Sequence, residues 1–269
     1  MYSAVMIIGD ATNPRTYERI SSASIDAVVT SPPYALQRRY GGVPEHDYPN
    51  WTVDWMSALQ RVLKPSGSVA IVIRSHVRDG AVDPYILRTR LALHDAGWRE
   101  PEELIWNKIS GSPVGHRNRP RRSWEHILWF ARPQGDGHVR CHCDPKGNGV
   151  KSARIGYTGS SAQAAYQYGM GANSAGIARS TDIAAVPLSA NEPGIDHPAV
   201  YPPALAEWII RLICPPRGIV LDPFLGSGTT GVAAEKCKRR WVGIELDGRY
   251  VEMAKERVTD QRVRYPRAG

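Results

Sequence analysis

Cysteines are scarce in this sequence. The 269 residues include only four, Cys141, Cys143, Cys214 and Cys237. They are too few and too irregularly spaced for a disulfide framework, so we expect free thiols. The CHCD run that holds the first two lacks a second ligand pair at zinc-finger spacing, and no metal site is predicted.

Long apolar runs are also missing. No stretch approaches the roughly 18 consecutive apolar residues of a membrane helix. The opening MYSAVMIIGD has neither the basic region nor the long apolar segment of a signal peptide. We therefore expect a cytoplasmic protein without a membrane partner.

Positive charge, in contrast, is in excess. Lysine and arginine number 34 against 26 aspartates and glutamates, which gives a net charge of +8 and a pI near 9.4. Such an excess favours a polyanionic partner. A hydrophobic content of 42% in a chain of this length is enough for one large α/β domain, or for one domain with an insert.

Apolar periodicity predicts alternating strands and helices on both sides of an irregular middle segment. Between positions 135 and 194 the periodicity fades and ten glycines occur. We divide the chain into 1–133, an insert at 134–195, and 196–269. Strands are predicted at 4–10, 25–30, 67–73, 102–108, 126–132, 218–222 and 241–246, and helices at 52–64, 84–97, 203–213, 229–240 and 248–258.

The stretch DAVVTSPPYAL begins as a buried strand and stops at two prolines. The prolines stiffen the turn and supply no N–H, while the carbonyls of Ser31 and Pro32 and the serine hydroxyl remain as acceptors. Tyr34 adds a flat ring that can stack on a planar group. This strand end suits a planar molecule that carries an amino group.

A second constellation lies near the C-terminal end. An apolar strand ends in Asp222, a turn contains Gly226 and Gly228, and a helix and a second strand lead to Glu245, 19 residues after Gly226. Glycines allow a sharp turn and close approach of the backbone to a ligand, and the carboxylate suits ribose hydroxyls. The GK[ST] ending of a P-loop is missing, so the pattern favours a nucleoside site. Only one clear strand follows Gly228, so the rest of the sheet must come from earlier in the chain, in permuted strand order.

The motifs TSPPY at 30–34 and DPFLGSGTT at 222–230, in that order, resemble the β-group of S-adenosylmethionine-dependent DNA amino methyltransferases. The resemblance implies an α/β fold, a Rossmann-like class I methyltransferase sheet in permuted order with a loop-rich target-recognition insert. The catalytic residues that it implies are Ser31, Pro32, Pro33 and Tyr34.

The resemblance also implies a set of cofactor contacts. Within this set, Glu245 matches the ribose-binding acid, Asp10 lies near the adenine, and His197 belongs to a segment that closes the methionine pocket. In WEHILWFAR the acid precedes the histidine, which departs from many relatives, and we assign Glu125 and His126 no catalytic role. The implied cofactor-binding residues are Asp10, Ala11, Thr30, His197, Asp222, Pro223, Phe224, Gly226, Ser227, Gly228, Thr229, Thr230 and Glu245.

The resemblance favours N4 of a flipped-out cytosine as the methyl acceptor, because SPPY is the form usual among the N4 enzymes of this family, with N6 of adenine as the alternative. A catalytically inactive DNA-binding protein is the alternative from another class. A nicotinamide oxidoreductase is disfavoured by the SPPY turn and the permuted order. Methylation at C5 is set aside because no cysteine lies near such a turn.

Double-stranded DNA is the predicted partner. Between Asn107 and Trp124 the chain has five basic residues and no acidic one, which suits phosphate contact. The resemblance further leaves open a cognate restriction endonuclease and a homodimer, in a bacterial or phage-encoded system. The predicted DNA-binding residues are Lys108, Arg117, Arg119, Arg121 and Arg122.

Overall fold

The computed structural model describes residues 4–35, 42–109, 119–133, 181–188 and 201–264. Within them one eight-stranded sheet dominates, in the order β1-β10-β9-β2-β3-β7-β6-β8. The strands are β1 (Ala4–Ile8), β2 (Ile25–Thr30), β3 (Leu63–Ile73), β6 (Arg99–Asn107), β7 (Trp124–Ala131), β8 (Ile183–Ala185), β9 (Ile219–Asp222) and β10 (Arg240–Glu245).

All neighbouring strands of this sheet are parallel except where β7 pairs with β3 and with β6. At the β2–β9 boundary the connections leave in opposite directions, toward β3 on one side and toward β10 on the other. In open α/β sheets such a switch point leaves a crevice at the carboxyl ends of the strands. Both motif-bearing strands, β2 and β9, end there.

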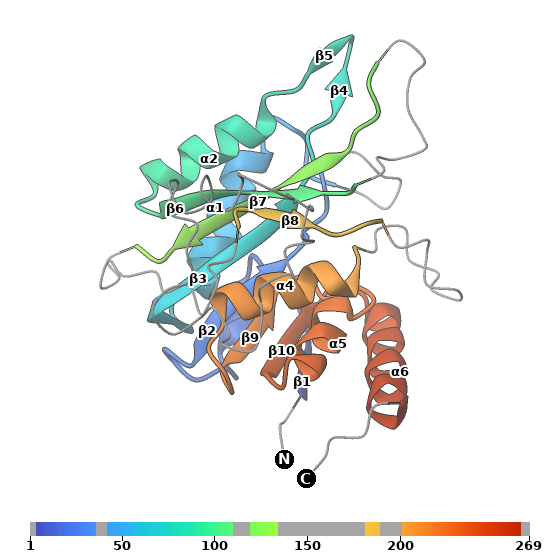
Figure 1. Ribbon diagram of the computed structural model, residues 1–269. Helices are drawn as coiled ribbons and strands as arrows, with labels where there is room; N and C mark the ends of the chain where they lie inside the picture. The colour runs from blue at the N-terminus through green and yellow to red at the C-terminus, as the bar shows by residue number, and fades with distance from the viewer. Residues whose placement is uncertain (1–3, 36–41, 110–118, 134–180, 189–200, 265–269) are drawn as a thin grey trace, which may run out of the picture.

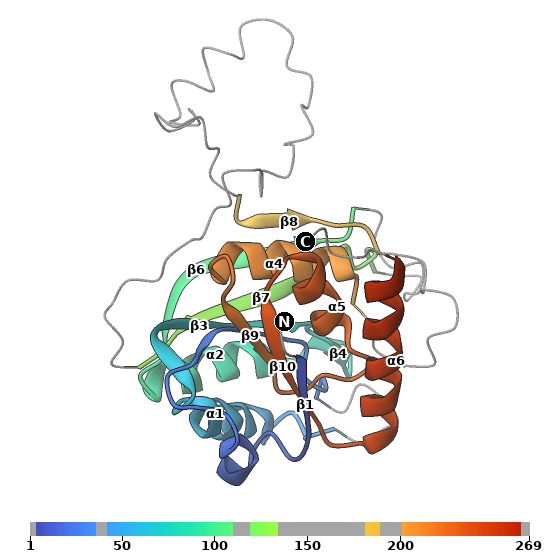
Figure 2. The same cartoon turned by 90° about the horizontal axis from the view of Figure 1, so that it is seen from below.

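Helices cover both faces of the sheet (Figures 1 and 2). One core cluster joins a face of the sheet to α4, α5 and α6, and the other joins the opposite face to the 3-10 helix, α1 and α2. A two-stranded hairpin, β4 (Val77–Arg78) and β5 (Ala81–Val82), projects beyond the sheet (Figure 1). The helices are η1 (Pro14–Tyr17), α1 (Tyr48–Leu59), α2 (Tyr85–Asp95), α4 (Pro203–Ile213), α5 (Thr229–Lys236) and α6 (Gly248–Arg264).

Several helix boundaries differ from the prediction, including that of α6, which continues to Arg264 instead of ending at position 258. The helix predicted at 52–64 is α1, which begins at Tyr48 and ends at Leu59, because β3 already pairs with β2 at Leu63. The KPSG segment is accommodated in β3 by a register shift instead of preceding the strand. The helix predicted at 229–240 ends at Lys236, where Lys238 adopts a left-handed conformation and the Arg239 N–H donates to the Ala234 carbonyl.

The predicted insert, 134–195, contributes to the sheet. Its described residues, 181–188, include β8, which pairs in parallel with β6 along Ile105 to Asn107. The rest of this segment lies outside the described residues, so the division into 1–133, 134–195 and 196–269 stays a prediction. Among the described helices, none is both long and apolar enough to span a membrane.

Candidate active site

The two sequence motifs meet at the carboxyl edge of the sheet. Thr30 ends β2 and Asp222 ends β9, and the Thr30 hydroxyl donates to Asp222 Oδ1 over 2.7 Å. Both side chains are buried. The turn that carries Ser31 is therefore fastened directly to the base of the glycine-rich loop.

The Asp222 carboxylate organises this loop through three hydrogen bonds. Besides the Thr30 hydroxyl, its carboxylate accepts the Phe224 N–H at 3.0 Å and the Thr230 hydroxyl. Burial raises the pKa of the Asp222 carboxyl to about 6, against the lowering effect of the hydrogen bonds from both threonines. The geometry gives Asp222 an organising role, and its direct contact with a cofactor stays a prediction.

The glycine loop turns as the sequence predicted. Gly226 and Gly228 both have positive φ, at 52° and 85°. A Cβ on Gly228 would lie 2.8 Å from the Cβ of Ala254 in α6. Glycine is thus needed at 228 for its backbone conformation and for the close packing of α6.

Glu245 lies beside this loop at the end of β10. Its Oε2 accepts the Gly226 N–H at 2.7 Å, and its Oε1 accepts the N–H groups of Leu246 and Asp247 at 2.9 and 3.0 Å. The carboxylate is half-buried and fixed by three backbone donors. Because a carboxylate has about four acceptor positions, one remains for a ribose hydroxyl.

Asp10 is brought next to Glu245 by strand pairing. Ile8 of β1 is in register with Glu245, and the Gly9 N–H donates to the Glu245 carbonyl. The Asp10 side chain accepts the N–H and hydroxyl of Thr12, which closes a tight turn, and Ala11 is buried. The predicted adenine and ribose acids thus lie at adjacent strand ends.

Phe224 forms an aromatic wall with two tryptophans that sequence reasoning missed. Its ring lies 5.3 Å from that of Trp51 and 5.4 Å from that of Trp55, both on α1. Together, the glycine turn, the adjacent acids and this wall fit a nucleoside cofactor. The spacing of the tryptophans resembled that of an ordinary amphipathic helix and gave no signal of a site.

Two further residues near the loop were also missed. The Tyr201 hydroxyl lies 2.6 Å from the Thr230 hydroxyl. Arg257 of α6 donates to the Ser227 carbonyl, to the Ser227 hydroxyl and to the Thr229 hydroxyl, at 2.9 to 3.1 Å. Ser227, Thr229 and Thr230 are buried, so these two residues secure the start of α5.

The SPPY turn is anchored by a residue to which the sequence assigned no catalytic role. The Tyr34 hydroxyl donates to Glu125 Oε2 at 3.0 Å, and the Ser31 hydroxyl donates to the Tyr34 oxygen at 3.4 Å. Burial raises the pKa of Tyr34 well above its usual value, and the Glu125 charge adds to the rise. Glu125 is buried at the start of β7. Because β7 is antiparallel to β3, this start lies at the carboxyl edge, a topology that the local sequence does not reveal.

Lys108 requires a correction. The sequence placed it among the DNA-contacting residues, but its side chain is only 3% exposed and pairs with Glu125. Its ammonium also lies 4.9 Å from the centre of the Trp106 ring. A buried, paired ammonium does not reach phosphates, so Lys108 belongs to the support of the SPPY turn.

Three of the other predicted DNA contacts lie at the same edge of the sheet. Arg119 and Arg121 are exposed. Arg122 is half-buried, and its Nη1 donates to the Ser75 carbonyl at 2.7 Å. The pKa of Arg122 is lowered by burial first, and then by the charges of Arg74 and Arg119. These residues form one cluster of positive charge.

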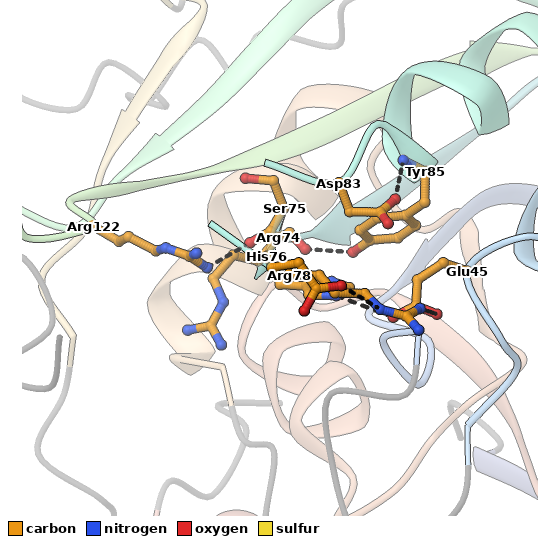
Figure 3. A network of polar contacts seen from close by, with 9 residues as sticks. Glu45, Arg74, Ser75, His76, Arg78, Asp83, Tyr85 and Arg122 are labelled. Carbon is orange, nitrogen blue, oxygen red and sulfur yellow. Dashed lines mark hydrogen bonds and ion pairs between the residues drawn. The ribbon is translucent and has the colours of Figure 1, made fainter. Parts of the chain in front are cut away.

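The β4–β5 hairpin contacts this cluster. Figure 3 shows Arg122 beside Ser75, just before the hairpin, and Glu45 beside His76 and Arg78. Arg119 donates to the Gly80 carbonyl at the hairpin turn, at 2.9 Å. On the other side of the hairpin, Glu45 lies 3.0 Å from His76 and 3.3 Å from Arg78. The hairpin is thus held between a buried carboxylate and the arginine segment.

Two predicted site residues, His197 and Arg117, lie outside the described residues. Their roles stay predictions. Among the described residues, no group of His, Cys, Asp or Glu side chains is arranged to hold a metal ion.

The chain is similar in sequence to known proteins. The chain is 29% identical over 301 residues to the type II methyltransferase M.SmaI of Serratia marcescens, covering 97% of this chain and 92% of that one. It is 27% identical to M.PvuII of Proteus hauseri, covering 96% and 84%.

Solved structures agree on the fold. PvuII DNA methyltransferase (cytosine-N4-specific) matches with a TM-score of 0.71 at 24% identity, over 97% of this chain and 92% of that one. A putative DNA modification methylase from Thermus thermophilus matches with a TM-score of 0.63 at 26% identity, over 96% and 95%. The family model described as DNA methylase matches residues 25–256, and the chain belongs to this N6/N4 DNA methyltransferase family.

Proposed function

We propose that this protein transfers a methyl group from S-adenosylmethionine to the exocyclic N4 of a cytosine flipped out of duplex DNA. The observation that carries the proposal is the Thr30–Asp222 hydrogen bond, which fixes the acceptor-rich Ser31 turn against the glycine loop. A nucleoside cofactor in that loop and a base at that turn would be neighbours. Such positioning lowers the barrier for a direct transfer.

The acceptors of the turn act on the nucleophile. An exocyclic amino nitrogen is a poor nucleophile because its lone pair is delocalised into the ring. Hydrogen bonds from its two N–H groups to the Ser31 oxygen and the Pro32 carbonyl favour a tetrahedral nitrogen with an available lone pair. The cofactor would supply an electrophilic methyl group, whose bond to sulfur breaks as the bond to nitrogen forms; S-adenosylhomocysteine leaves and one amino proton passes to solvent. The half-buried ring of Tyr34 supports the base by stacking.

Asp10, Glu245 and the glycine loop bind the cofactor in this proposal. The Glu245 carboxylate, fixed by three backbone donors, accepts from the ribose, and Asp10 lies toward the adenine. Phe224 lines the site from the α1 side. The loop residues Pro223, Ser227, Thr229 and Thr230 shape the methionine end.

Cytosine is preferred over adenine for two reasons. The turn has the SPPY form, which resembles that of the N4-cytosine enzymes of the family. The structure that matches with a TM-score of 0.71 is that of a cytosine-N4-specific enzyme. Adenine N6 is the alternative acceptor, since the same geometry serves either amino group.

DNA reaches the site from the arginine side. Arg119, Arg121 and Arg122 contact phosphates, and the segment 134–195 reads the sequence. A restriction endonuclease partner and a cytoplasmic location belong to the same proposal, because the relatives are type II methyltransferases.

The test is incubation with labelled S-adenosylmethionine and mixed-sequence unmethylated DNA, followed by nucleoside mass spectrometry. The expected product is N4-methylcytosine, and Ser31→Ala should lower its rate by about 100-fold. Formation of N6-methyladenine would support the proposed transfer to an amino group and would identify adenine, not cytosine, as the target base. If the protein binds DNA and cofactor but forms no methylated base on several genomic DNAs, a non-catalytic binding protein is favoured.

A further inference from the structure

A chain of polar groups leads away from the SPPY turn, half-buried at Ser31 and Tyr34 and buried at Glu125 and Lys108. It runs from Ser31 to Tyr34, then to Glu125 and Lys108. We propose that Lys108 and Glu125 are positioning residues that fix the direction of the Ser31 hydroxyl through Tyr34. This inference rests on the proposed methyl transfer and adds two residues to its machinery.

The ion pair lies between strands at the site edge. Lys108 follows β6 and Glu125 is the second residue of β7, and Trp106 is in register with Glu125. The Lys108 N–H donates to the Ser123 carbonyl, which continues the pairing by one residue. β3 separates β7 from β2, so Tyr34 reaches across the end of β3 to meet Glu125.

Donor and acceptor chemistry dictates the direction of each bond. An ammonium can only donate, and an ionised carboxylate can only accept. Tyr34 must therefore donate its hydroxyl proton to Glu125. The Tyr34 oxygen then accepts the hydroxyl proton of Ser31 at 3.4 Å.

This direction matters for the nucleophile. With its proton turned toward Tyr34, the Ser31 oxygen presents lone pairs and accepts from the amino group of the base. A Ser31 proton turned toward the base would instead bond the nitrogen lone pair, which is the pair that must attack. The Glu125 carboxylate thus sets Ser31 as an acceptor before the base arrives.

Stability alone does not explain this pair. Burying two opposite charges costs desolvation, and a well-packed apolar pair is often as stable or more stable. The Lys108 and Glu125 side chains are 3% and 6% exposed, which is nearly complete burial. The second oxygen of Glu125 is the feature that an apolar pair lacks, and it bonds Tyr34.

The experiment is a double-mutant cycle of Tyr34→Phe and Glu125→Gln. Single-turnover rates are measured at saturating S-adenosylmethionine and DNA. Phenylalanine keeps the ring that stacks on the base and removes only the hydroxyl. Glutamine keeps the shape of Glu125 and can turn its NH₂ group toward Tyr34, which reverses the chain of bonds.

Each single variant should lower the rate by about tenfold, the scale of one lost orienting hydrogen bond. The double variant should be no slower than Glu125→Gln, because both changes break the same chain. Affinities for S-adenosylhomocysteine and for DNA should stay at wild-type values, which a general structural defect would not allow. The control is Glu235→Gln. Glu235 is a buried carboxylate on α5 that accepts the Trp241 indole N–H from β10, and this variant should methylate DNA at the wild-type rate.

The outcomes separate the two proposals. A wild-type protein that methylates no DNA would overturn the proposed function, and the positioning role with it. A methylating wild type whose rate survives in both single variants would overturn the positioning role alone. If Glu125→Gln does not fold, Tyr34→Phe decides the matter, because it leaves the ion pair intact and full activity in it contradicts the inference.

Discussion

The hydroxyl of Thr30 and the carboxylate of Asp222 are 192 positions apart in the chain and 2.7 Å apart in the structure. This hydrogen bond joins the two halves of the site, and it is buried on both sides. We expect Thr30→Val to lower the free energy of unfolding by about 1–3 kcal/mol, because the buried Asp222 carboxylate loses one of its three hydrogen-bond donors. Urea unfolding checks this value. Ser24→Ala removes an exposed hydroxyl and should change stability by less than about 0.5 kcal/mol, and an equal loss in both variants would contradict the role of the bond.

Asp222 should make the stability of the protein depend on pH. Its pKa is raised to about 6 by burial, from an unfolded value near 4, so between these values the folded state binds the proton more tightly. Stability therefore falls as pH rises from about 4 to 6, by on the order of 2–3 kcal/mol from this group. Asp222→Asn cannot ionise and should lack this contribution. Unfolding of both proteins at pH 4.5 and pH 7 is the measurement, and identical pH dependence would contradict the assignment.

Gly228→Ala should disrupt the glycine loop, the proposed cofactor site. The substitution places a Cβ 2.8 Å from the Cβ of Ala254 at a φ of 85°. We expect a loss of about 2–4 kcal/mol in stability together with much weaker binding of S-adenosylhomocysteine. Gly80→Ala is the matched control, because its φ is 88° but no atom of the described residues lies within 4 Å of its added Cβ. The control should lose only the backbone part, about 1 kcal/mol, and should bind the cofactor product normally.

Reversal of one exposed charge tests the DNA face. Arg121→Glu should weaken DNA binding about tenfold at low salt and reduce the slope of log K against log salt by about 1. Arg99→Glu makes the same charge change at the start of β6, on the opposite edge of the sheet, and should have a much smaller effect. Fluorescence anisotropy at several salt concentrations measures both. Equal effects of the two variants would indicate a general charge effect instead of a contact at the arginine cluster.

The sequence was sufficient to predict the parts of the site that are formed by residues close together in the chain. Strand, turn and glycine signals lie within a few residues in TSPPY and DPFLGSGTT, so the alternating fold and the ends of β2 and β9 followed from them. The pairing of Tyr34 with Glu125 spans 91 positions and depends on β7 running antiparallel to β3. No local pattern encodes that neighbour relation.

The error on Lys108 has a related cause. In the sequence it is the first of a run of basic residues without a nearby acid, since its partner Glu125 lies beyond the run. Charge patterns report composition and not burial, whereas the structure shows that one cation of the run points inward. The boundary between α1 and β3 was missed because KPSG is a strong turn signal, which strand pairing overrode.

The pairing of β2 with β9 also determines when, during synthesis of the chain, the central sheet can be completed. At ribosomal speeds of about 5–20 residues per second, roughly 10–40 seconds separate the synthesis of Thr30 from that of Asp222. β1 likewise cannot pair in the sheet until its partner β10 has been synthesised. During this interval the nascent chain exposes the edge of β2 that later pairs with β9, and the SPPY turn has no glycine loop beside it. The β2–β9 and β1–β10 pairings, and with them the proposed site, can therefore form only after residues 219–245 have been made.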